Sequence, residues 1–332
     1  MWRRCHKPVR RRQFTLHAAA SQRTAKRRER LHQLLPALEF KDRPDLTNSI
    51  FIAAWAGWPD AGEAATRAIR ELVRQLDAKK FASIDPEDFY DFADIRPVVS
   101  NEPDGSRKLS WPENDFYYVK ASKPTERDIV LFIGVEPHLK WRQYVEHVLT
   151  VTGACDVSLV LTIGALLDSV PHTREPRVTG SASTENLGPG FESVKYPKPA
   201  YEGPSGITSA VLERFGDQQV KSASIWGHSP HYVQVAHNPM LTVAILKELG
   251  VFLPKSLDLG RLEKESEEFA ENLVRALEDQ KEIEGYVKRL EERYDSEEES
   301  RTSPEPEALV RELEEFLRQQ REESENDDGD DE

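Results

Sequence analysis

Short apolar runs alternate with stretches of helical period along most of this chain. Residues 50–56 form an apolar run of the length of a buried strand, and a tight turn at residues 57–59 ends it. Asp60 and Glu63 then have the spacing of a helix-capping box, and apolar residues recur at helical spacing over residues 64–76. The pattern predicts a strand, a turn and a helix, the first unit of an α/β layer fold.

The same alternation continues downstream, so that an α/β fold is predicted for the middle of the chain. Near-continuous apolar runs are typical of central strands that are buried on both faces. Further strands are predicted at residues 80–84, 116–120, 128–135, 157–163, 177–183 and 221–227. Helices are predicted at residues 141–150, 207–215 and 239–249. A hairpin is predicted from residues 96–100 and 107–111 around a strong turn signal at residues 101–105.

From Leu257 onward the period is purely helical. Two leucine-rich stripes predict a helical pair joined near Asp279, and they are too short for the sustained heptads of a coiled coil. We therefore expect this pair to pack on the core. A charged linker at residues 295–303 and one more short helix at residues 306–320 are expected after it.

The two ends of the chain carry opposite charge. Residues 1–30 hold eleven Lys or Arg and one acidic residue, whereas residues 295–332 hold seventeen acidic residues and four arginines. The whole chain has a net charge of −14, which argues against a general nucleic-acid binder. Single-sign charge with few apolar residues predicts disorder. The predicted organisation is a basic disordered tail at 1–36, a core domain at 37–254, a helical extension packed on the core at 255–294, and an acidic tail with a short helix at 295–332.

The basic end has other interpretations than a disordered tail. It lacks the apolar segment that a secretory or twin-arginine signal requires. An Arg-rich organellar transit peptide and a start codon assigned too far upstream are the two alternatives.

No cofactor and no metal are expected. Gly57 and Gly62 have the spacing of a phosphate-binding P-loop, but Glu63 and Ala64 stand where Lys and Ser or Thr are needed. The two cysteines make neither a metal site nor a disulfide framework, which fits a reducing compartment. The apolar runs are too short to cross a bilayer, so we expect a cytoplasmic protein.

Ionisable side chains follow several predicted strands. Because the carboxyl ends of parallel strands meet at one edge of a sheet, these side chains could converge there. They are Asp60, Glu136, His138, Asp168 and His172. One hypothesis is a small-molecule enzyme of nucleosidase or hydrolase type, which uses Asp60 and Glu136 for acid–base chemistry. The other is that Asp60 caps a helix and the rest make hydrogen bonds in loops.

A histidine pair, a nucleophile motif and the tryptophans are the further candidates for functional sites. His228 and His231 are three residues apart, but zinc would need more ligands than the neighbouring sequence offers. No Gly-x-Ser-x-Gly elbow supplies a nucleophile. Tryptophans at strand ends or turns predict interface aromatics, although burial in the core is the commoner fate of a tryptophan. They are Trp55, Trp58, Trp111, Trp141 and Trp226.

Six segments in order resemble the proteasome assembly chaperone 2 family in its bacterial, actinobacterial form. They are IFIAAWAGWPDAGEAAT (50–66), FIGVEPHLKWRQY (132–144), LVLTIGALLDSVPHTR (159–174), VTGSAS (178–183), GPSGITSAVL (203–212) and SIWGHSPHYV (224–233). The resemblance covers about residues 40–295. It implies a three-layer αβα core similar to the phosphorylase/hydrolase-like fold, self-association, and a link to the proteasome.

The resemblance implies a non-catalytic protein-interaction or assembly factor. Its expected partners are further copies of itself and proteasome subunits or related assembly factors, with neither nucleic acid nor membrane. Archaeal factors of the family dock through a C-terminal hydrophobic-Tyr-X end, but this chain ends Gly-Asp-Asp-Glu, so that docking mode is not carried over. No catalytic residue is expected. The candidate pocket or partner-contact residues are Trp58, Asp60, Glu136, His138, Asp168, His172 and His231.

Overall fold

The computed structural model describes residues 37–302, apart from residues 124–125, 189–190, 192–193, 195, 199, 234 and 278–280. The described residues form two compact units. The first comprises residues 37–168 and 176–271, and the second comprises residues 169–175 and the part of the chain from residue 272. The basic tail and the short helix predicted at residues 306–320 lie outside the described residues.

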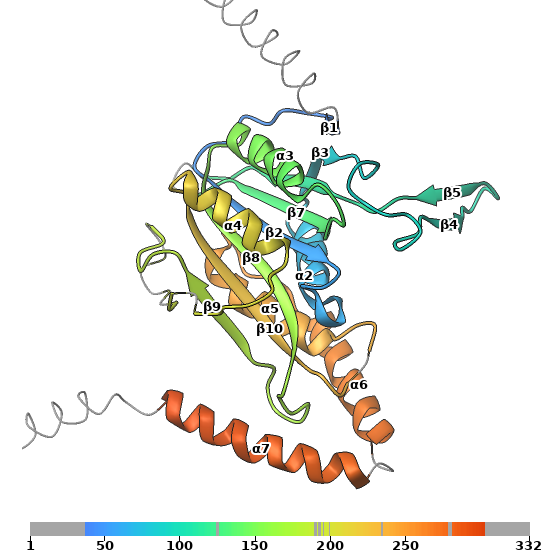
Figure 1. Cartoon of the computed structure of the whole chain (residues 1–332), viewed down its shortest axis with the longest axis vertical. Coiled ribbons are helices and arrows are strands. Elements are labelled where there is room, and N and C mark those ends of the chain that lie inside the picture. Colours follow the sequence, from blue (N-terminus) through green and yellow to red (C-terminus); the bar gives the residue numbers. More distant parts are fainter. Residues whose placement is uncertain are drawn as a thin grey trace, which may run out of the picture. The chain divides into compact units, whose positions relative to one another are not determined.

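The first unit is built on an eight-stranded mixed sheet with the order β1-β3-β6-β7-β2-β8-β10-β9 (Figure 1). Its centre, β7-β2-β8-β10, is parallel, and antiparallel neighbours flank it on both sides. The bounds are β1 Leu38–Phe40, β2 Ser49–Ala56, β3 Lys79–Ile84, β6 Asp115–Val119, β7 Ile129–Val135, β8 Val157–Asp168, β9 Val178–Ala182 and β10 Lys221–Pro230.

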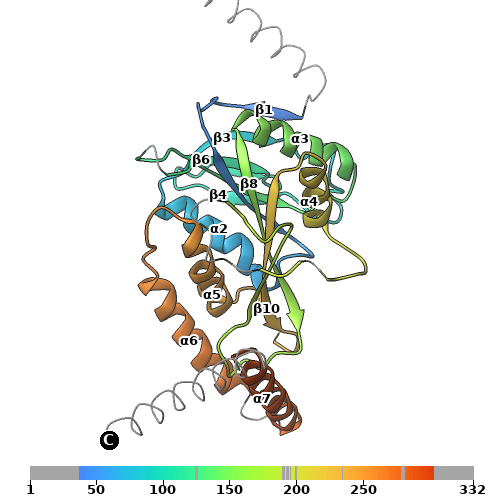
Figure 2. The same cartoon turned by 90° about the vertical axis from the view of Figure 1, so that its left-hand side faces the viewer.

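Helices cover both faces of this sheet, as Figure 2 shows edge-on. Ile50, Ile52 and Ala54 of β2 pack with α2 and α5, whereas Phe51 and Trp55 of the same strand pack with α3 and α4. A strand covered on both sides must be apolar at every position, which explains the continuous apolar runs of the sequence. The predicted three-layer αβα core is confirmed, whereas its likeness to the phosphorylase/hydrolase-like fold stays a prediction. The helices are α2 Ala64–Gln75, α3 Trp141–Ala154, α4 Ile207–Asp217, α5 Pro239–Leu249 and the short η2 Gly250–Phe252.

Aromatic rings fill the layer between the sheet and α3 and α4. The ring centroids of Phe116 and Phe132 are 4.5 Å apart, and those of Trp55 and Phe132 are 5.3 Å apart. Trp55 is fully buried, and its indole N–H donates to the hydroxyl of Tyr144 at 3.1 Å. The prediction that Trp55 is an interface aromatic is therefore wrong, since the residue completes the core.

The first helix begins later than the capping-box spacing predicts. Gly62 and Glu63 have left-handed backbone conformations, with φ of 62° and 47°, so the regular helix starts only at Ala64, after the short η1 (Ala61–Glu63). Asp60 still caps the helix, because its carboxylate accepts from the backbone N–H of Ala65 at 2.7 Å. The Glu63 carboxylate lies 3.0 Å from the Nδ1 of His237 and does not complete a capping box.

Two strands extend beyond their predicted ends. β8 and β10 stay paired in parallel as far as Asp168 and Pro230, which are five and three residues beyond the predicted limits. Asp168 and His228 lie beyond the predicted strand limits of 163 and 227, yet both belong to strands, because Asp168 ends β8 and His228 lies within β10.

The predicted hairpin forms a separate two-stranded sheet from β4 (Val98–Asn101) and β5 (Arg107–Ser110). All eight strand residues are exposed, and Figure 1 shows the hairpin extending away from the main sheet. Trp111, directly after β5, is 43% exposed and packs edge-on against Phe92.

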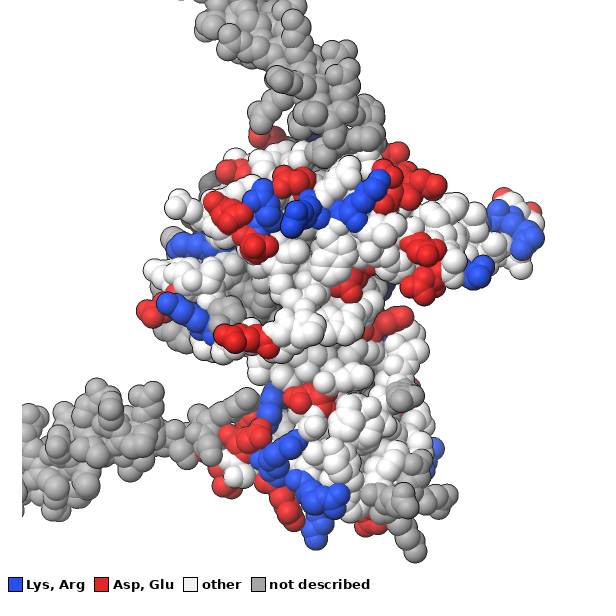
Figure 3. Space-filling view, viewed as in Figure 1, with Lys and Arg blue, Asp and Glu red and all other residues white. Residues whose placement is uncertain are grey.

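Charge is intermixed on the surface of the described residues. Figure 3 shows Lys and Arg beside Asp and Glu over the described elements, without a large patch of one sign in that view. None of the described helices has an apolar stretch long enough to span a membrane.

The predicted helical pair is present as α6 (Gly260–Leu277) and α7 (Lys281–Thr302). Leu262 of α6 is buried in the core cluster on the α2 and α5 side of the sheet. A helical extension that packs on the core over residues 255–294 stays a prediction. In the second unit, Arg174 pairs with Glu291 and Asp295 of α7. Residues 295–302 are helical, which corrects the predicted linker, because Glu and Arg are good helix formers even in a highly charged segment. A core that ends at residue 254 stays a prediction.

Candidate functional site

A cavity of about 1300 Å³ lies in the first unit at the carboxyl ends of β8 and β10. Its walls come from the turn after β2, from β8, β9 and β10, from the loop before α4, and from α4 itself. Ala223 and Ile225 point to the α2 and α5 side, so the neighbouring Ser224 and Trp226, which line the cavity, point to the α4 side. The cavity is therefore the part of that face which α4 leaves open.

Two glycines allow the cavity walls to form. A Cβ on Gly164 would lie 2.5 Å from the ring of Trp226, so the absence of a side chain lets the indole lie against β8. A Cβ on Gly206, just before α4, would lie 2.9 Å from a carboxylate oxygen of Glu136 and 3.3 Å from the ring of Trp58. Larger residues at either position would push these aromatic side chains out of place.

Three large apolar side chains at the cavity are exposed. Trp58 is 66% exposed, Leu167 is 61% exposed and Tyr201 is 72% exposed, and all three line the cavity. We call these three residues the cavity rim. Large apolar side chains grouped around a concave surface are typical of a binding site.

A chain of hydrogen bonds reaches the cavity wall from the strand ends. The Nδ1 of His228 on β10 lies 2.8 Å from an Asp168 carboxylate oxygen at the end of β8. The Nε2 of the same ring lies 2.9 Å from the hydroxyl oxygen of Thr179 on β9. Thr179 lines the cavity, whereas the His228 side chain is only 13% exposed. The three strands thus place a carboxylate, an imidazole and a hydroxyl in series.

The cavity wall favours neutral or anionic occupants. Lys198 and His231 are its basic residues, and no Asp or Glu is among its described lining residues. Within the described part of the chain, no group of three or more His, Cys, Asp or Glu side chains is placed to hold a metal ion.

The part of the chain that holds this cavity matches a known family. The model of the PAC2 family covers residues 54–277, which include every lining residue. This chain belongs to the PAC2 family. The resemblance drawn from its six sequence segments is thereby confirmed, while the actinobacterial form stays a prediction.

Solved structures of similar proteins have the same fold. A PAC2 family protein from Streptomyces avermitilis is 33% identical with a TM-score of 0.64, over 72% of this chain and 99% of that chain. A Mycobacterium tuberculosis proteasome-assembly chaperone homologue is 30% identical with a TM-score of 0.62, over the same shares. A Pyrococcus furiosus archaeal proteasome activator shares the fold at 20% identity and a TM-score of 0.58, over 73% of this chain and 98% of that chain. No match was found among curated protein sequences.

In this PAC2 protein the two carboxylates of the enzyme hypothesis each serve a helix start. Asp60 is buried and accepts from the hydroxyl of Thr66 at 2.5 Å, and burial raises its pKa to about 6. Glu136 accepts from the backbone N–H of Ile207, in the first turn of α4, at 2.8 Å. Neither residue is among the described lining residues of the cavity. The geometry therefore favours capping for both.

The other predicted site residues lie at the cavity, in a loop and in the second unit. Trp58 and His231 line the cavity, and Asp168 contacts it through His228 and Thr179. His138 lies in a loop, where its Nδ1 accepts from the backbone N–H of Asp91 at 3.1 Å and its ring packs on Tyr90.

His172 belongs to the second unit of the PAC2 chain, where burial lowers its pKa. The described structure therefore does not bring the five predicted ionisable residues together at one edge of the sheet. Leu167, Thr179 and Tyr201 are among the lining residues that were missed as site residues. For Thr179 the available signal was the alternation of small polar residues with others in 178–183.

Proposed function

We propose that this protein is an assembly factor of the proteasome-chaperone type, which binds its partner through the cavity rim. PAC2 membership supports this, as does the 30% identity to a protein described as a proteasome-assembly chaperone homologue. The observation that carries the binding surface is the grouping of Trp58, Leu167 and Tyr201, all more than half exposed, around one cavity. Exposed Trp and Tyr at a concave surface are typical anchors of protein interfaces.

The chemistry of the wall restricts the partner. Lys198 and His231 are basic and the described lining offers no carboxylate, so a segment with an apolar anchor and a neutral or acidic flank fits best. Proteasome subunits and related assembly factors are the partners we expect, in the cytoplasm. A second copy of the chain is expected to associate as well. Binding of this kind requires no catalysis.

Affinity purification of the full-length tagged chain from its own host tests the proposal. We expect proteasome subunits or related assembly factors to co-purify, as identified by mass spectrometry. Trp58→Ala should lower their recovery by at least about tenfold, since truncation of an interface anchor commonly costs about 2 kcal/mol.

Trp111→Ala is the matched control, because Trp111 is 43% exposed and is not among the residues that line the cavity. Both variants should melt at the wild-type temperature. Recovery of no proteasome-related protein by the wild type would count against the assembly role. Equal losses from the two variants would remove the cavity rim as the binding surface.

A further inference from the structure

The hydrogen bonds from Thr179 to His228 and from His228 to Asp168 run in the direction that activates a hydroxyl group. An aspartate carboxylate can only accept, so the Nδ1 of His228 donates its N–H to Asp168 at 2.8 Å. In the neutral ring this leaves Nε2 as an acceptor, and Thr179 donates its hydroxyl proton to it at 2.9 Å. The carboxylate thus holds the imidazole in the tautomer and orientation of a general base for Thr179.

The pairing of the strands maintains this arrangement. His228 lies opposite Leu166 in the parallel pair of β10 and β8, and Thr179 lies opposite Trp226 in the antiparallel pair of β10 and β9. Side chains two residues apart on a strand share a face, so all three groups lie on the side of the sheet that holds the cavity. Each partner comes from a different strand, and the group that lines the cavity is the hydroxyl.

We propose that Thr179 is a nucleophile that accepts an acyl group from small esters bound in the cavity, with His228 as the general base and Asp168 as the positioning residue. This activity is additional to partner binding and does not depend on it. The three residues lie on three different strands, so no local motif such as a nucleophile elbow marks them in the sequence.

The acyl transfer is balanced without a further reagent. The Thr179 oxygen attacks the carbonyl carbon of the ester and forms a new C–O bond, while His228 Nε2 takes the hydroxyl proton. The bond from the carbonyl carbon to the leaving oxygen then breaks, and His228 returns the proton to that oxygen as the alcohol departs. Water later attacks the acyl-threonine by the same route and releases the acid. No electron transfer is involved.

The lining sets the substrate class. Leu166, Leu212, Trp226 and Val233 provide an apolar wall that suits an aliphatic or aromatic acyl chain. About 1300 Å³ holds a molecule well beyond the size of an acetyl ester. Esters with a medium-length acyl chain should therefore react faster than the acetyl ester.

Single-turnover acylation of the full chain with p-nitrophenyl hexanoate tests the proposal. We expect a burst of one p-nitrophenolate per chain, and peptide mass spectrometry should place the hexanoyl group on Thr179. Thr179→Val should abolish this label and Thr179→Ser should retain it. His228→Gln should slow the burst by about a hundredfold or more, the usual contribution of a general base. Asp168→Asn should slow it as well.

Thr150→Val is the matched control. Thr150 lies on α3, its hydroxyl donates to the backbone carbonyl of Glu146 at 2.7 Å, and it is not among the residues that line the cavity. This variant should react as the wild type does. The Thr179→Ser and His228→Gln pair keeps the test decisive even if Thr179→Val does not fold.

The absence of a burst, a hexanoyl group found only on lysines, or an undiminished rate in His228→Gln would each overturn the proposal. A purely structural role of the three residues predicts lower melting temperatures for their variants and no acylated Thr179 in any protein. The labelled residue therefore distinguishes the two roles directly. Failure here would leave the partner-binding proposal untouched, since that is tested at Trp58.

Discussion

Asp60 is a buried carboxylate whose ionisation opposes folding. Burial raises its pKa from its usual value of 3.8 to about 6, despite hydrogen bonds from Ala65 and Thr66 that favour the charged form. The folded state therefore binds a proton more tightly than the unfolded state between these two pH values. The resulting stability is fully present below pH 3.8 and is lost as the pH rises through about 6.

Asp60→Asn should remove this pH dependence. Asparagine can still accept the N–H of Ala65, so the cap is kept while the titration is lost. The free energy of unfolding of the wild type should rise relative to the variant between pH 7 and pH 4, by up to about 3 kcal/mol. Urea unfolding at a series of pH values measures this difference.

Asp217→Asn is the control for the general effect of removing one carboxylate, because Asp217 is exposed and pairs with Arg214 at the surface. The prediction would be contradicted if the free energy of unfolding changed with pH in the same way for the wild type and Asp60→Asn between pH 4 and pH 7.

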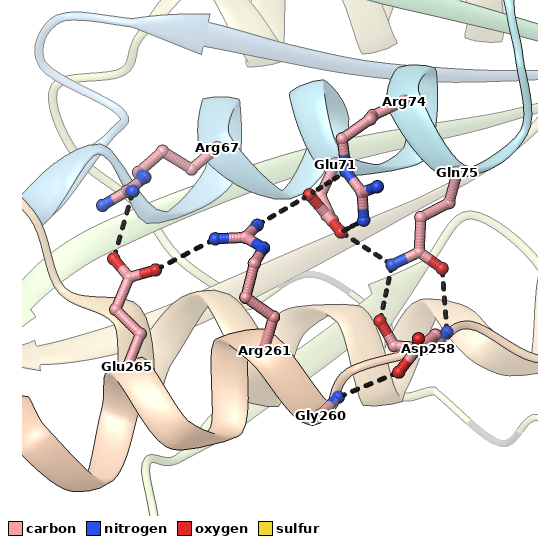
Figure 4. Close-up of polar contacts among 8 residues, drawn as sticks. All are labelled: Arg67, Glu71, Arg74, Gln75, Asp258, Gly260, Arg261 and Glu265. Carbon is pink, nitrogen blue, oxygen red and sulfur yellow. Dashed lines mark hydrogen bonds and ion pairs between the residues drawn. The ribbon is translucent and has the colours of Figure 1, made fainter.

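At the scale of elements, a polar cluster joins α6 to α2. Figure 4 shows Arg261 of α6 between two acidic residues, 3.2 Å from Glu71 of α2 and 3.3 Å from Glu265 of its own helix. Gln75 of α2 exchanges two hydrogen bonds with the backbone of Asp258, at 2.7 and 2.8 Å. The side chain of Glu71 is only 8% exposed. The cluster thus adds polar contacts between α6 and α2 to the apolar burial of the neighbouring Leu262.

Glu71→Gln should weaken this contact above pH 4.5 and leave it nearly unchanged near pH 2. Hydrogen bonds from Arg74 are the main reason that the pKa of Glu71 falls from 4.5 to about 2. A lowered pKa contributes stability that is present above the unfolded value and is lost as the pH falls through the folded value. The expected loss in the variant at pH 6 is about 1–2 kcal/mol, because solvent screens the largely exposed arginines.

Urea unfolding at pH 6 and pH 2 measures this effect. Glu268→Gln is the matched control, since its side chain lies on α6, is 66% exposed and pairs with Lys264 at 3.9 Å. The role of Glu71 would be disproved if both variants lost the same stability, or if the loss in Glu71→Gln did not shrink in acid.

At the scale of the whole molecule, strong charge of opposite sign is concentrated at the two ends of the chain. Residues 1–36 contain no long apolar run and residues 303–332 hold few apolar residues, so burial of these ends could offset little of the entropy that ordering would cost. A chain trimmed to residues 37–302 should therefore melt within about 2 °C of the full chain. Light scattering should give the same number of copies per particle for both chains, and that number should be more than one.

The trimmed chain keeps α7 whole, because that helix runs to Thr302. A loss of several degrees on trimming would show that an end segment packs on the rest of the chain. A mass of one copy at micromolar concentration would contradict self-association.

The sequence by itself was sufficient for the family and for most of the strands and helices, although it did not predict β1 or the full lengths of β8 and β10. Apolar periodicity is local, so residues 50–56 and 128–135 were recognisable as strands covered on both faces, and Pro239 marked the start of α5. The hairpin followed from its turn residues for the same reason. These features depend on neighbours within a few positions along the chain.

Only the tertiary structure decided which polar residues meet and which aromatic residues stay in water. Trp55 and Trp58 are three residues apart, yet helices cover the first and nothing in the described structure covers most of the second. Thr179 and His228 are 49 positions apart and Asp168 is 60 from His228, so their hydrogen bonds depend on the register of three strands. Register is set by pairing between distant segments, which a local pattern does not contain.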